Sequence, residues 1–141
     1  MLKELADNTP IWSAAIAWLI AQFLKIVLTY VSEKKIDLKR AYGSGGMPSS
    51  HTAFSVSLAV SIGKIYGFNA PSFSVACVLA MIVMYDAAGV RRAAGQHAAS
   101  INELFKQNGL NLNDQLKELL GHTPLQVFAG AILGILVGIV Y

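Results

Sequence analysis

The chain has 141 residues, of which 55% are hydrophobic and only 13% are charged, and its mean hydropathy is +0.52. Soluble domains carry about 25% charged residues, so this composition excludes an ordinary water-soluble, disordered or collagen-like chain. The formal charge of +3 does not indicate nucleic-acid binding, because the basic residues adjoin apolar segments and form no patch interleaved with aromatic residues. A single cysteine excludes a disulfide framework. We therefore expect a small integral membrane protein with a single domain over residues 1–141.

Four apolar segments follow one another along the chain, and none shows the alternation typical of strands. Each is close to the roughly 17–25 residues that a helix needs to cross a bilayer. An open sheet cannot lie in lipid, because the polar groups along its edges would have no hydrogen-bond partners. We therefore predict an all-α integral membrane bundle of about four transmembrane helices, over residues 11–31, 51–66, 71–90 and 124–141.

The loops between these segments predict the topology. Residues 32–50 and 91–123 each carry several basic residues, whereas residues 67–70 form only a tight turn. Four crossings place both basic loops on one side of the membrane. The positive-inside rule makes that side cytoplasmic, with both termini on the other side.

Residues 91–121 predict two short amphipathic helices within the second basic loop. Apolar residues recur there at helical spacing in two groups, which Asn108 and Gly109 separate. These helices either lie on the membrane surface or over a site, or simply cover the end of the bundle. The two groups are Ala94, Ala98, Ile101, Leu104 and Phe105, and then Leu112, Leu116, Leu119 and Leu120.

Ionisable residues associated with the apolar segments gather near the end of the bundle where the basic loops lie. Insertion scales put the cost of one such residue inside the membrane at about 2.5–3.5 kcal/mol, so these residues usually mark a function. Each has an ordinary explanation when taken alone: a lysine can extend to the interface, an arginine pair can set the topology, and a histidine can cap a helix. Their convergence on one end favours a functional site. They are Lys25, His51, Asp86, Arg91, Arg92 and His122.

His51 and His122 each stand at the start of a predicted helix. Free N–H groups and the helix dipole make such N-termini favourable for anions. Lysine and arginine at the same end add positive charge, and a guanidinium can bind two oxygens of one group, so phosphate is the anion that fits best. Two histidines beside a phosphate suggest chemistry, because one can attack phosphorus while the other protonates the leaving oxygen.

Two short motifs resemble those of a known superfamily. Pro48-Ser49-Ser50-His51 resembles the P-S-G-H motif of the type 2 phosphatidic acid phosphatase superfamily, which includes the vanadium haloperoxidases. Residues 121–130, GHTPLQVFAG, resemble the end of its third motif. Nearly the whole chain is similar to the small divergent branch of that superfamily. The resemblance implies a small bacterial protein of the cytoplasmic membrane.

The resemblance also implies roles for four residues of these motifs. His122 matches the nucleophilic histidine that forms a phosphohistidine, and His51 matches the general acid that protonates the leaving group. Ser49 and the backbone of Ser50 match the turn that cradles the phosphate. The resemblance implies no metal ion and no other cofactor.

The first motif of the superfamily, K-x6-R-P, is absent as written. Lys25 is the candidate for its lysine, with Lys39 or Arg40 as substitutes from the loop. Either Arg91 or Arg92 fills the role of the third motif's arginine if the residues between that pair and Gly121 are an insertion inside the motif.

The acidic residue that orients the nucleophilic histidine in the superfamily falls on Gln126. Glutamine can accept a hydrogen bond from the ring but cannot stabilise an imidazolium by charge. Asp86 lies at the same end of the predicted bundle, so we expect it to serve as the third catalytic residue.

These observations predict a metal-independent membrane phosphatase that hydrolyses a lipid-linked phosphomonoester or diphosphate. The alternative is a non-catalytic lipid-phosphate-binding protein that kept the phosphate cradle and lost turnover, as Gln126 and the missing first motif suggest. A proton-coupled transporter is disfavoured, because the chain lacks inverted repeats. Four thin helices enclose a lipid poorly, so a homodimer is expected, with a stripe of small residues as its candidate contact: Gly130, Ala131, Gly134 and Gly138.

Overall fold

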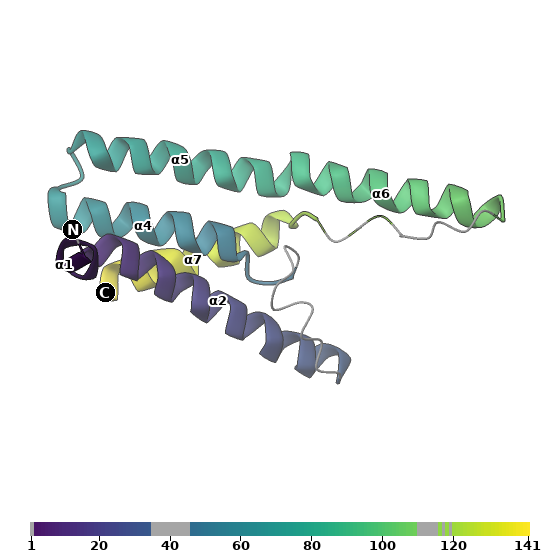
Figure 1. Cartoon of the computed structure of the whole chain (residues 1–141), viewed down its shortest axis with the longest axis horizontal. Helices are drawn as coiled ribbons and strands as arrows, with labels where there is room; N and C mark the ends of the chain where they lie inside the picture. Colours follow the sequence, from purple (N-terminus) through teal and green to yellow (C-terminus); the bar gives the residue numbers. More distant parts are fainter. Residues whose placement is uncertain (1, 35–45, 110–115, 117, 119) are drawn as a thin grey trace.

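The computed structural model describes residues 2–34, 46–109, 116, 118 and 120–141. Within these residues the chain forms helices joined by turns and irregular segments, without strands, so the predicted all-α membrane bundle is confirmed (Figure 1). The helices are α1 (Leu2–Ala6), α2 (Thr9–Glu33), α4 (Ser50–Tyr66), α5 (Pro71–Ala88), α6 (Val90–Gln107) and α7 (Pro124–Val140).

Side-chain caps fix where three of the long helices begin. Asn8 precedes α2 and accepts a hydrogen bond from the backbone N–H of Ile11, and Ser49 does the same for Thr52 in α4. Thr123 and Gln126 form a reciprocal capping box at the start of α7. Such caps satisfy N–H groups that a helix leaves free in its first turn. Both histidine-bearing helix starts are therefore set by local sequence.

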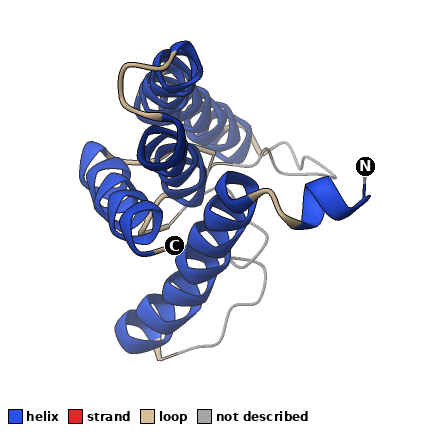
Figure 2. Ribbon diagram, turned by 90° about the vertical axis from the view of Figure 1, so that its left-hand side faces the viewer, coloured by secondary structure: helices blue, strands red, loops and turns tan. Residues whose placement is uncertain are grey.

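The bundle is organised around α4, which packs against α2, α5 and α7. Figure 2 shows the helices of the bundle packed beside one another. The buried face of α4 carries only small and polar residues besides Val56, which allows the neighbouring helices to approach closely. The hydroxyls of Ser13 and Ser57 lie 2.8 Å apart and satisfy one another, whereas the buried hydroxyl of Ser61 has no partner among the described residues. Large apolar side chains instead cover the outside of the bundle, as expected for a protein surrounded by lipid.

Glycines on α7 form the contact with α4. A Cβ atom added to Gly130 would lie 2.5 Å from the carbonyl oxygen of Ser49, and one added to Gly134 would lie 2.8 Å from that of Ala53. Gly138 is packed equally closely against Val60. The predicted close helix–helix contact is therefore present, but it lies within one chain. The glycines of the stripe are buried against α4, so the expectation that they form a dimer contact is wrong.

The termini and the α4–α5 turn lie at one end of the bundle, and the starts of α4 and α7 lie at the other (Figure 1). This is the arrangement that four crossings require. Two continuous helical stretches, Thr9–Val31 and Pro71–Gln107, are long and apolar enough to cross a membrane, and α7 is a shorter apolar helix. The side of the membrane that each end faces stays a prediction from the loop charges.

Helix α6 continues α5 in nearly the same direction and extends beyond the bundle (Figure 1). The hydrogen-bond ladder runs through the break, since Gly89 donates to the carbonyl of Tyr85 and accepts from Ala93. This is the first of the two predicted amphipathic helices, and it does not fold back over the end of the bundle. Most of the second lies outside the described residues, and its described residues 116, 118 and 120 are not helical.

Candidate functional site

His122 is held against the end of α5 by its backbone. Its N–H donates to the carbonyl oxygen of Ala87 at 3.0 Å, and only 2% of the residue is exposed. The preceding Gly121 allows this approach, because an added Cβ would lie 2.7 Å from the carbonyl carbon of Arg91. A histidine from the start of α7 is thereby placed beside the last turn of α5.

The ring of His122 is oriented by Gln126. Its Nδ1 atom lies 3.2 Å from the Oε1 atom of Gln126, which can only accept a hydrogen bond. Nδ1 therefore carries the proton and Nε2 carries a lone pair. That Nε2 atom is buried and has no hydrogen-bond partner among the described residues. The arrangement leaves a nitrogen with a lone pair and no hydrogen-bond partner in the described part of the chain.

The surroundings of His122 favour the neutral ring. Burial lowers the pKa of His122 below its usual value, and the positive charge of Lys25 lowers it further. The hydrogen bond to Gln126 opposes this shift without reversing it. The lone pair on Nε2 is therefore available at neutral pH.

A cavity of about 180 Å³ brings together four of the predicted site residues. His51 reaches it from the first turn of α4, and Asp86 from the last turn of α5. Aliphatic side chains from α5 form the rest of the wall. The lining residues are His51, Ile82, Val83, Asp86, Ala87, Arg91 and His122.

Asp86 and Arg91 form an ion pair at the rim of this cavity. The Nε atom of Arg91 lies 2.5 Å from Oδ2 of Asp86, and both side chains are partly exposed. In this structure the ring N–H of His122 therefore goes to Gln126, while the carboxylate of Asp86 is paired with Arg91. Arg92 is exposed and does not line the cavity, which places Arg91 nearer to any bound group.

Lys25 is almost completely buried, with 1% of its surface exposed. Its Nζ atom donates to the hydroxyl of Ser50 at 3.0 Å, and the structure gives it no carboxylate partner within the described residues. A buried charge is costly unless it is paired. This ammonium group lies close enough to influence His122, so an anion bound beside the histidine would supply the missing partner.

The turn before α4 lies beside Lys25 and leads into the helix that carries His51. Gly46 has a φ of +94°, a left-handed conformation that favours glycine, and a Cβ added to it would lie 3.8 Å from the side chain of Lys25. The hydroxyl of Ser49 caps the helix and accepts a second hydrogen bond from the hydroxyl of Thr52 at 3.0 Å. Ser49 is therefore occupied with the helix start, whereas the hydroxyl of Ser50 meets the lysine.

Comparison with known proteins identifies the family. Residues 6–137 match the model of the divergent PAP2 family. The chain belongs to this family. It is also 36% identical to an uncharacterized membrane protein, YuiD, of Bacillus subtilis (strain 168), over 97% of this chain and 96% of that protein. No solved structure matches this chain.

In this divergent PAP2 protein, the two segments that carry the resemblance meet through the backbone. The N–H of Ser49 donates to the carbonyl oxygen of Gln126 at 3.0 Å. The glycine contact between Gly130 and the carbonyl of Ser49 lies one turn further along α7. The start of α4 is thus fixed to the first turn of α7, and His51 and His122 face one cavity.

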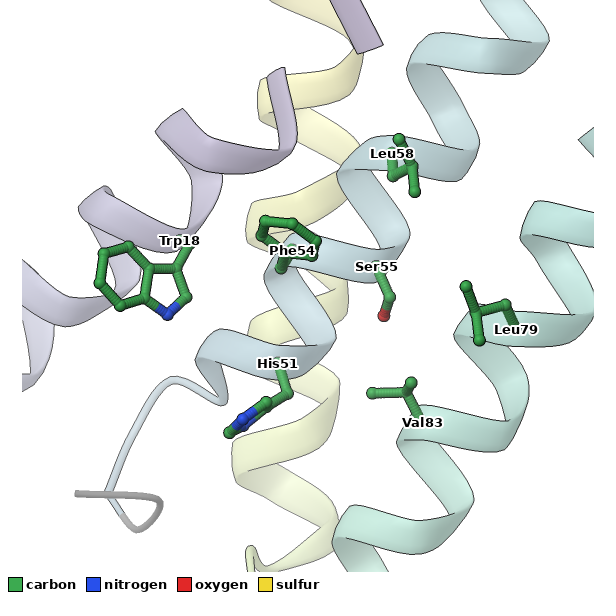
Figure 3. Close-up of a pocket in the computed structure, with 7 residues that line it drawn as sticks. All are labelled: Trp18, His51, Phe54, Ser55, Leu58, Leu79 and Val83. Atoms are coloured by element: carbon green, nitrogen blue, oxygen red, sulfur yellow. The ribbon is translucent and has the colours of Figure 1, made fainter. Parts of the chain in front are cut away.

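A second cavity of about 400 Å³ adjoins the first and was not predicted from the sequence. It lies between α2, α4 and α5, and both cavities include His51 and Val83 in their walls (Figure 3). The sequence does contain a signal for this cavity, because the four lining residues on α4 have the i, i+3, i+4, i+7 spacing of one helix face. The lining residues are Trp18, His51, Phe54, Ser55, Leu58, Leu79 and Val83.

Proposed function

We propose that this divergent PAP2 protein is a membrane phosphatase that hydrolyses a lipid-linked phosphomonoester or diphosphate through a phosphohistidine at His122. The observation that carries the proposal is the buried Nε2 atom of His122, which has a lone pair and no hydrogen-bond partner among the described residues. An unpartnered buried nitrogen beside a cavity is unusual in a folded protein and calls for a functional explanation.

The charges around the cavity support phosphate as the group that binds there. Lys25 is buried without a carboxylate partner in the described part of the chain, and Arg91 lines the same cavity as His122. A lysine and an arginine together supply charge-assisted hydrogen bonds to phosphate oxygens. These cations stabilise the negative charge that develops in phosphoryl transfer. In this proposal the reaction needs no metal ion.

In the first step the lone pair of His122 Nε2 attacks phosphorus. A P–N bond forms and the bond from phosphorus to the leaving oxygen breaks. In its protonated form His51, which lines the same cavity, gives its proton to that oxygen, so that the lipid alcohol or the shorter phosphate leaves with this oxygen protonated.

In the second step water replaces the lipid product. The neutral ring of His51 takes a proton from this water while the water oxygen attacks the phosphohistidine. The P–N bond breaks, inorganic phosphate leaves, and His122 regains its lone pair. His51 is again protonated, so each turnover consumes one water molecule and leaves the protein unchanged.

The test is phosphate release by the purified protein in detergent, with a panel of lipid phosphates and with EDTA present. We expect release from at least one lipid and loss of release in His122→Ala. His97→Ala is the matched control, because His97 is exposed on α6 outside the cavity. Acid-labile label from a radioactive phosphate donor should remain on the wild-type chain and be absent from His122→Ala. Release that survives His122→Ala would contradict the proposal.

The second candidate function is a non-catalytic binder of lipid phosphate. The observation that favours it is the neutral partner of His122: Gln126 cannot stabilise a charged phosphohistidine ring, and Asp86 is paired with Arg91. A binder would show saturable affinity for phosphatidic acid in vesicles and release no phosphate from any lipid of the panel.

A further inference from the structure

The cavity between α2, α4 and α5 is apolar along most of its length. Figure 3 shows Trp18 on one side, Leu79 and Val83 on the other, and the face of α4 between them. The one hydroxyl in this wall, that of Ser55, donates to the backbone carbonyl of Thr52 at 3.3 Å. Apart from the indole of Trp18 and the ring of His51 at its end, the wall therefore offers a carbon surface.

This apolar groove adjoins the polar cavity at His122. His51 and Val83 line both, so His51 stands where the carbon surface ends and the ionisable groups begin. A ligand that filled both spaces would have an anionic group at one end and a hydrocarbon portion at the other.

The direction of the groove matches that of a lipid chain. Its wall on α4 extends from His51 to Leu58, which is about 10 Å along a helix axis. One leaflet of the hydrocarbon core is about 15 Å thick. The groove therefore runs from the end of the bundle that carries the charges toward the middle of the bilayer, over much of one leaflet.

The groove also opens sideways toward the surrounding lipid. Trp18 is 39% exposed, Phe54 42% and Leu79 49%, so the side chains that form its edges are themselves at the lipid-facing surface. A chain can enter from the bilayer without passing through the end of the bundle.

We propose that this groove holds one hydrocarbon chain of the same lipid whose phosphate group binds at His122, an inference that rests on the proposed function. The occupant is a lipid chain rather than a free apolar molecule, because the groove leads to a site built for an anion. The protein then selects lipid phosphates over water-soluble phosphates because it binds the hydrocarbon chain as well as the phosphate group.

A first experiment narrows the groove and compares two substrates. Leu79→Trp adds bulk to its wall, and Val78→Trp makes the same type of change at a neighbouring lipid-exposed position of α5 that does not line it. We expect Leu79→Trp to lower kcat/KM for dipalmitoyl phosphatidic acid at least about tenfold and to change that for phenyl phosphate less than about twofold. Val78→Trp should change neither. An equal loss with both substrates, or no loss with either, would overturn the groove assignment.

A second experiment measures binding without turnover. The chain has two tryptophans, so Trp12→Phe leaves Trp18 in the groove wall as the only indole. In vesicles, phosphatidic acid with brominated chains should quench Trp18 fluorescence more than brominated phosphatidylglycerol at the same mole fraction. Unbrominated phosphatidic acid should reverse that excess. Equal quenching by the two brominated lipids would overturn the proposal.

The two experiments separate this proposal from the proposed function. Preferential quenching in a protein that releases no phosphate would support the groove and contradict the phosphatase. Phosphate release that is lost in His122→Ala but unaffected by Leu79→Trp would support the phosphatase and overturn the groove.

Discussion

The Nδ1 atom of His122 and the Oε1 atom of Gln126 lie 3.2 Å apart, and the same amide oxygen accepts the backbone N–H of Thr123. One neutral side chain thus caps α7 and fixes the tautomer of the buried histidine. The relationship orients the ring without lending it a charge. Gln126 can therefore orient the ring of His122 but cannot stabilise a positive charge on it. A substitution that adds a charge at this position tests the electrostatic contribution alone.

Gln126→Glu should add the missing charge and leave the geometry in place. A glutamate at this position retains the capping box, and its carboxylate would stabilise the ring as it gains positive charge. We expect kcat for a lipid phosphate to rise at least about tenfold. Gln126→Leu, which removes the acceptor, should lower kcat and destabilise the fold by about 1–3 kcal/mol. A Gln126→Glu protein with unchanged or lower kcat would show that charge at this position does not limit turnover.

The pH dependence should reflect the lowered pKa of His122. Burial favours the neutral ring, so protonation should reduce the nucleophile only at pH values below the usual histidine pKa of 6.5. In a His51→Ala protein, where no general acid titrates, the rate of phosphohistidine formation from an aryl phosphate with a good leaving group, measured in single-turnover experiments, is expected to stay flat from pH 8 to about 6.5 and to fall at lower pH. An acidic limb centred above 6.5 would be inconsistent with a desolvated ring.

The free energy of unfolding should also decrease at low pH because of His122. The folded state binds fewer protons at His122 than the unfolded state does, because the folded pKa is the lower of the two. This contribution is fully present above about pH 6.5 and is lost as the pH falls through the folded pKa. Chemical unfolding in detergent should therefore lose less stability on acidification in His122→Ala than in the wild type.

Lys25→Met should weaken anion binding without weakening the fold. The substitution removes a buried charge that has no carboxylate partner in the described residues and replaces it with an apolar chain of similar length. We expect affinity for inorganic phosphate or vanadate to fall at least about tenfold, with no decrease in Tm. Lys64→Met is the matched control, because Lys64 is exposed and bonds to the carbonyl of Ile139 at the other end of the bundle. Unchanged anion affinity in Lys25→Met would remove the lysine from the site.

Gly134→Ala should destabilise the contact between α4 and α7. The new Cβ would lie 2.8 Å from the carbonyl oxygen of Ala53 and 2.9 Å from Cβ of Val56, so the helices must move apart. Overpacking of this kind costs about 1–3 kcal/mol. Ile135→Phe adds more volume at a neighbouring position that is 42% exposed toward lipid, and it should leave the thermal unfolding temperature in detergent nearly unchanged.

The bundle could be predicted from the sequence because its signals are local. Apolar length marks the crossings, and Thr123, Pro124 and Gly121 mark the start of α7. The direction of α6 could not be predicted in this way. Gly89 looks like a place to turn, yet its backbone groups keep their helical hydrogen bonds, and the chain continues straight.

The candidate site was predictable as a group of residues but not in its pairings. Convergence on one end of the bundle brings His51, Asp86, Arg91 and His122 to one cavity. The partner of each side chain depends on distances of a few ångströms between helices, which spacing along the chain does not determine. Gln126 meets His122 because both lie on the same turn, whereas Asp86 is within reach of Arg91 on its own continuous helix.

The backbone hydrogen bond from His122 to Ala87 joins the start of α7 to the end of α5, although the two residues are far apart in the sequence. After Ala87 the chain leaves the bundle along α6, and Gly121, next to His122, packs against the backbone of Arg91 and Arg92. His122 is thus positioned by contacts at the end of α5 and the start of α6, and not by the far end of α6. A change in the length of the part of α6 that extends beyond the bundle should therefore leave the histidine in place.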